Sequence, residues 1–109
     1  MMAAVELLIG HQFWLGRADF VERFVEIDTS DAPGVLLASV DWAGAVAGLR
    51  SGRLVCSRSQ GQVLAIAASM ADGVPVDLRD ALCGLDARAV ALVVAAVATM
   101  TGRGPVFSW

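Results

Sequence analysis

Two cysteines and a single histidine are the side chains of this chain best suited to chemistry. A thiol nucleophile needs a base within hydrogen-bond reach, and His11 is the only imidazole that could serve Cys56 or Cys83. Cys56 is the better candidate because it directly precedes an expected helix, whose positive N-terminal end lowers a thiol pKa. No flanking protease or transferase signature accompanies it. We therefore expect both cysteines to be packing residues.

Metal and cofactor sites have too few ligands in this sequence. Two Cys and one His, far apart along the chain, give three soft ligands where structural zinc uses four at paired spacing. Asp77 and Asp80 lie within one helical turn, but helix capping and the preference for anions in a first turn explain both. The glycines match no phosphate-binding pattern. We expect no catalytic residue, no metal and no cofactor.

The segment 77–100 has the outline of a helix-turn-helix, with a turn that contains Gly84. A DNA-reading second helix needs polar or cationic side chains at its exposed start, where only Arg88 qualifies. The formal net charge of −3 and the scattered Arg residues disfavour sequence-independent binding to the phosphate backbone of DNA. A packed helical hairpin is therefore favoured. Arg79, Arg88 and Arg103 on one exposed face would instead support DNA binding.

Composition points toward contacts between helices and between copies. Hydrophobic residues make up 57% of the 109 residues and charged residues 17%, so little polar surface is left to cover a monomer. Gly44 and Gly48 have the four-residue spacing of small residues that allows close helix approach, inside the monomer or between copies. We expect self-association as a homo-oligomer.

The C-terminal segment 103–109 ends in two large aromatic side chains, Phe107 and Trp109. Each aromatic side chain buries on the order of 150–250 Å² when it packs. We expect this tail to dock, either on its own monomer near Trp42 or Phe24 or in a groove of a partner subunit.

The location of the protein is inferred from its composition. All basic residues are Arg, and Lys, Asn and Tyr are missing, which is typical of a GC-rich genome. The N-terminus lacks the cationic region of a signal peptide, and the uncharged run 89–102 is shorter than the ~18 residues of a membrane span. We expect a cytoplasmic protein with reduced thiols and no membrane contact.

Start and stop signals divide the second half of the chain into helices. Ser57 and Gln60 have capping-box spacing, and Gly73 with Pro75 ends that helix. Asp77 opens a short helix that Gly84 ends. Asp86 caps the final helix, whose uncharged surface predicts a central position with a buried stripe. That stripe comprises Val90, Val93, Val94 and Val97, of which Val93, Val94 and Val97 should be nearly fully buried.

The first half gives weaker signals. Asp41 caps a helix, ended by Gly52, whose stripe is Trp42, Ala45, Val46 and Leu49. A helix over 11–27 would align Phe13, Phe20, Phe24 and Ile27, with Asp19 and Arg23 as an ion pair. Residues 28–34 read as a loop, residues 3–9 as helix or edge strand, and residues 35–40 as irregular or helical.

Between Val40 and Thr101 the chain carries a specific string of short segments, namely Asp41-Trp42, Gly52-Arg53-Leu54, Cys56-Ser57, Ala67-Ala68-Ser69, Asp72-Gly73-Val74-Pro75-Val76-Asp77-Leu78 and Gly84-Leu85-Asp86. This string resembles small uncharacterised helical proteins encoded in high-GC actinobacterial genomes, a group with no known activity. The resemblance implies a cytoplasmic bacterial protein and assigns no functional residue.

Together these signals predict one all-α domain over 1–109, with four or five short helices around a central apolar C-terminal helix. The predicted function is a non-enzymatic helical interaction or accessory protein, with Phe107, Trp109, Gly44 and Gly48 as possible interface residues. A DNA-associated regulator using 77–100 and a small thiol enzyme using Cys56 are the alternatives.

Overall fold

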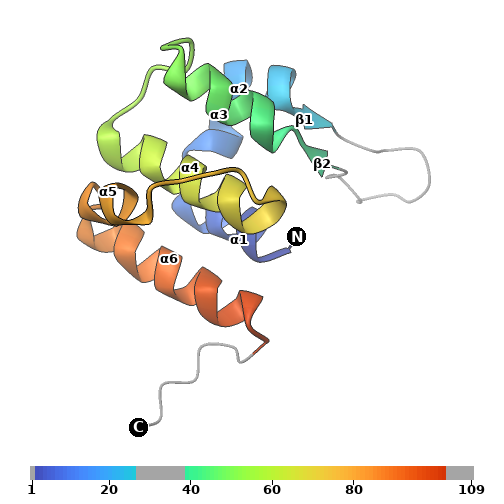
Figure 1. Cartoon of the computed structure of the whole chain (residues 1–109). Coiled ribbons are helices and arrows are strands. Elements are labelled where there is room, and N and C mark those ends of the chain that lie inside the picture. The colour runs from blue at the N-terminus through green and yellow to red at the C-terminus, as the bar shows by residue number, and fades with distance from the viewer. Residues whose placement is uncertain (1, 27–38, 103–109) are drawn as a thin grey trace, which may run out of the picture.

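The computed structural model describes residues 2–26 and 39–102, which form one mostly helical globule (Figure 1). This confirms the all-α class, with six α-helices in the described part instead of the predicted four or five. They are α1 (Met2–His11), α2 (Ala18–Phe24), α3 (Trp42–Arg50), α4 (Arg58–Asp72), α5 (Leu78–Cys83) and α6 (Ala87–Met100), and a 3-10 turn, η1 (Trp14–Gly16), follows α1. No helix of the described residues has the length and apolar character to cross a membrane.

Helix α4, not α6, occupies the centre of the bundle. It packs against α1, α3, α5 and α6 (Figure 1). Small side chains let these neighbours approach closely, and seven of its positions are buried: Gly61, Val63, Leu64, Ala65, Ile66, Ala67 and Ala68.

Among the described elements, only α1 and α4 make extensive contacts with α6. One side of α6 therefore stays open. Val93 is buried, as predicted, together with Ala89 and Ala96. The predicted burial of the other three stripe residues is wrong, because their side chains point away from both neighbouring helices. Val90, Val94 and Val97 remain 44%, 45% and 49% exposed.

The predicted helix caps are confirmed in detail. The Ser57 hydroxyl accepts the Gln60 N–H while the Gln60 side chain accepts the Ser57 N–H, which completes a capping box at the start of α4. Gly73 ends α4 in the left-handed conformation, at φ 66°. Asp41, Asp77 and Asp86 each accept a backbone N–H at the start of α3, α5 and α6.

The single helix predicted over 11–27 is wrong, because the chain turns twice in this region. Gln12, at φ 59°, follows the end of α1, and Arg17 is extended before α2 begins. These turns direct Trp14 and Phe20 into the core, where the Trp14 indole Nε1 donates to the Gln60 carbonyl oxygen at 2.9 Å. Asp19 forms its ion pair with Arg17. The predicted ion pair between Asp19 and Arg23 is wrong.

The structure shows which alternative holds for the two segments that the sequence left open, residues 3–9 and 35–40. Residues 3–9 are helical within α1. A short strand, β1 (Val25–Glu26), pairs antiparallel with β2 (Ser39–Val40), so the end of segment 35–40 is extended rather than irregular or helical. Ile27, residues 28–38, and the tail with Phe107 and Trp109 lie outside the described residues.

Candidate functional site

Cys56 lines a hollow of about 420 Å³ between the end of α3 and the start of α4. Burial raises the pKa of its thiol, and the nearby Arg17 guanidinium opposes this only in part. Desolvation is the largest effect, so the pKa of this thiol lies above its ordinary value. The lowered pKa predicted from its position before a helix is therefore wrong. Cys83, predicted to be a core residue, is exposed on α5.

His11 lies at the C-terminal end of α1, with only 7% of the residue exposed. Burial lowers the pKa of its imidazole, and the neighbouring Arg88 lowers it further while Asp86 raises it. Within the described residues, no hydrogen bond joins His11 to Cys56, and the charged group acting on that thiol is Arg17. The imidazole and the thiol are not brought together as a catalytic pair in this arrangement.

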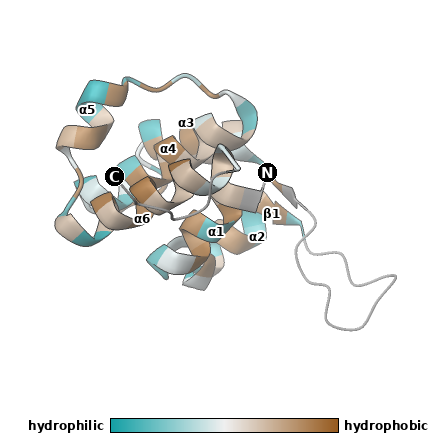
Figure 2. Cartoon of the chain, turned by 90° about the horizontal axis from the view of Figure 1, so that it is seen from below, coloured by the Kyte–Doolittle hydropathy of each residue, from teal (hydrophilic) through white to brown (hydrophobic). Residues whose placement is uncertain are grey.

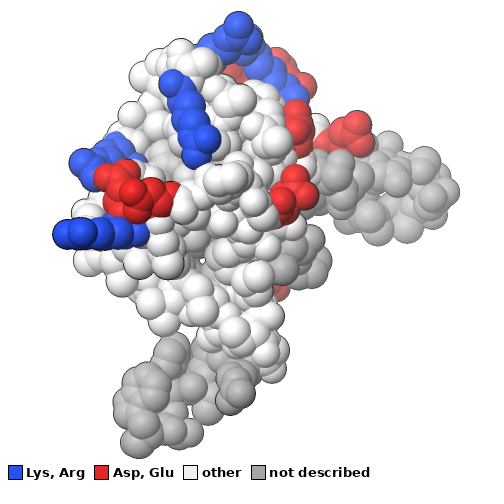
Figure 3. Space-filling view, in the orientation of Figure 1, with Lys and Arg blue, Asp and Glu red and all other residues white. Residues whose placement is uncertain are grey.

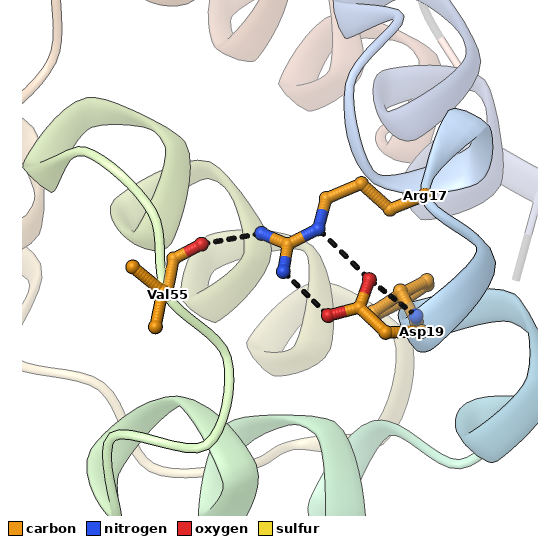
Figure 4. A network of polar contacts seen from close by, with 4 residues as sticks. Arg17, Asp19 and Val55 are labelled. Carbon is orange, nitrogen blue, oxygen red and sulfur yellow. Dashed lines mark hydrogen bonds and ion pairs between the residues drawn. The ribbon is translucent and has the colours of Figure 1, made fainter.

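Arg17 connects the start of α2 to the linker before α4 (Figure 4). Its guanidinium donates to the Asp19 carboxylate and to the Val55 carbonyl oxygen, and it lies over the rings of Phe13 and Trp14. Hydrogen bonding from Arg17 holds the pKa of Asp19 below its usual value. These contacts give Arg17 a structural role beside the hollow.

Gly44 and Gly48 have intramolecular reasons to be small. A Cβ on Gly44 would lie 2.2 Å from Asp41 Oδ2, because the capping carboxylate covers the start of α3. A Cβ on Gly48 would lie 3.3 Å from Phe24 Cζ. Both glycines border a second hollow, of about 330 Å³.

The helix-turn-helix outline at α5 and α6 offers little to a DNA base. The Arg88 guanidinium donates to the carbonyl oxygens of Gly10, at 2.8 Å, and His11, at 3.1 Å. It thereby caps the C-terminal end of α1. Arg79 is exposed on α5, and Arg103 lies outside the described residues.

Within the described residues, exposed large apolar side chains are concentrated on α5 and α6. Six of the eight exposed large hydrophobic residues in the described part belong to these helices, namely Leu78, Leu82, Val90, Val94, Val97 and Met100. Figure 2 views this side from below, with apolar residues along α6. In Figure 3 the surface below the blue and red side chains at the left edge is white, so this part of the face carries no charged side chain.

Three of these residues form one line along the helix. Val90, Val94 and Val97 follow the four-then-three spacing that places side chains on one helix face, and we call them the α6 seam. The sequence pattern assigned them to the core because α6 is apolar on every side. Ala89, Val93 and Ala96 have the same spacing one residue earlier and form the buried face, so spacing alone does not distinguish the two faces.

No family model, curated protein or solved structure matches this chain. The chemistry of its own surface therefore carries the functional assignment.

Proposed function

We propose that this protein is a non-enzymatic interaction protein that docks a protein partner on the α6 seam. The observation that carries this proposal is a line of half-exposed valines on a helix whose only charged residue is Arg88. Contiguous exposed apolar surface on a folded chain typically marks an interaction site.

The free energy available at the seam supports binding. Burying a methylene group is worth about 0.8 kcal/mol, so covering three half-exposed valine side chains contributes on the order of 3 kcal/mol from this side alone. A partner with a matching apolar helix contributes a similar amount. A contact of this kind gives reversible binding, because association itself costs at least about 4 kcal/mol.

The state of the two side chains that could be catalytic, Cys56 and His11, favours this proposal over catalysis. The Cys56 thiol is held protonated at neutral pH by burial, and a structural thiol of this kind is inert. His11 is buried at the C-terminal end of α1, where Arg88 uses its guanidinium to cap that helix. We place this docking role in the bacterial cytoplasm, as the composition and the actinobacterial resemblance indicate.

Co-purification from the native host tests the proposal with a matched pair of variants. Val94→Glu places a carboxylate in the seam, while Val55→Glu adds the same charge at a valine that is 75% exposed beside the Cys56 hollow. We expect the partner to be lost with Val94→Glu and retained with Val55→Glu. The opposite pattern would assign docking to the hollow.

A further inference from the structure

Helix α6 is only half covered in the monomer. Ala89, Val93 and Ala96 are buried against α1 and α4, while the α6 seam lies outside those contacts. A helix that is apolar on every side belongs where every side is covered. The seam therefore calls for one more apolar helix, and α6 itself supplies an apolar helix of matching length.

We propose that the occupant is a second copy of this chain, whose α6 lies antiparallel across the seam with a twofold axis near Val94. This inference rests on the proposed function and names its partner. Val90 lies four residues before Val94 and Val97 three residues after it. The twofold axis therefore places Val90 beside Val97 of the partner subunit, so the same surface meets itself.

Residues bordering the seam suit this pairing. Ala91 and Ala98 carry the smallest side chain that a helix favours, so two α6 helices can approach to about 8–10 Å. In an antiparallel pair the N-terminal end of each α6 lies beside the C-terminal end of the other, and the opposite partial charges attract.

Charge does not oppose a second copy at the seam. Two copies that each carry a net charge of −3 repel one another wherever their charged faces meet. The seam lacks charged side chains, so copies that meet there bring no like charges into contact.

The size of the contact sets its strength. Fourteen residues make α6 about 21 Å long, which is short for a stable interface of about 800 Å² on each partner. We therefore infer a reversible dimer whose population rises with protein concentration.

Sedimentation equilibrium of the full chain tests this inference. The wild-type mass should rise with concentration from 11.3 kDa toward twice that value. Val94→Glu and Val94→Arg should each remain monomeric, because the axis places two like charges against one another. An equimolar mixture of these two variants should form a dimer again, because Glu then faces Arg. Val55→Glu, the charge-matched control, should behave as the wild type.

Three results would overturn the second copy as occupant. One is a wild-type mass that stays at 11.3 kDa up to the highest soluble concentration. A second is a Val94→Glu chain with native circular dichroism that still dimerises. The third is loss of the dimer in a full-length Phe107→Ser, Trp109→Ser variant, which would assign the contact to the tail. In each case the docking proposal is still tested separately, by comparing which proteins co-purify with the Val94→Glu and the Val55→Glu variants.

Discussion

Two adjacent valines on α6 provide a direct test of which face of this helix is buried. Val93 is 6% exposed and Val94 45% exposed, and both can be replaced by Ala. Each replacement removes two methyl groups at about 0.8 kcal/mol each when fully buried, with an added cavity cost at a packed site of about 1 kcal/mol. The gain in helix propensity from Val to Ala, about 0.5 kcal/mol, is common to both variants.

These terms predict that Val93→Ala lowers the free energy of unfolding by about 2 kcal/mol and Val94→Ala by less than about 0.5 kcal/mol. Urea denaturation followed by circular dichroism measures both values. With a slope of about 1–3 kcal/mol per M, the two midpoints should differ by roughly 1 M. The protein must be dilute, because a dimer would add stability by mass action. Equal losses in the two variants would refute the assigned orientation of α6.

The remaining predictions concern a cap, a buried imidazole and a thiol. Ser57→Ala should lower the free energy of unfolding by about 1 kcal/mol, measured by urea denaturation, because it removes the capping box. Because the folded-state pKa of His11 is below its usual 6.5, the folded chain binds fewer protons than the unfolded chain, and stability should fall as pH falls from about 7.5 to about 5.5. His11→Gln should flatten this dependence of stability on pH, as measured by thermal melts at several pH values. An unchanged pH dependence in the variant would show that His11 is not its cause. Cys56→Ser should leave partner binding intact, and titration of the wild type with an electrophilic dye at neutral pH should find a slow thiol at this position; fast labelling there would revive a thiol enzyme.

Local signals in the sequence predicted the helix ends well. Asp41, Ser57, Asp77 and Asp86 cap helices as predicted, because capping depends on a side chain and a backbone N–H three residues away. Gly73 ends α4 for an equally local reason, its left-handed conformation.

Features set by tertiary packing could not be predicted in the same way. The apolar pattern of α6 does not say how many neighbours reach the helix, and so Val94 and Val97 were assigned to the core. The turns at Gln12 and Arg17 accompany the burial of Trp14 and Phe20 and the hydrogen bond from the Trp14 indole to α4, which no local pattern records. Likewise, the raised pKa of Cys56 follows from burial that only the fold determines.

The most direct test of the α6 seam as a docking surface is disulfide trapping between two copies. Val94→Cys and, as the control on another side of the same helix, Ala95→Cys are each made in a chain with Cys56 and Cys83 replaced by Ser. Ala95 is exposed but lies outside the seam. Under mild oxidation, the Val94→Cys chain should form a covalent dimer quickly, because the twofold axis brings the two Cβ atoms together. The Ala95→Cys chain should form it slowly. Equal rates in the two chains, or faster trapping through Ala95→Cys, would contradict a dimer built on the seam.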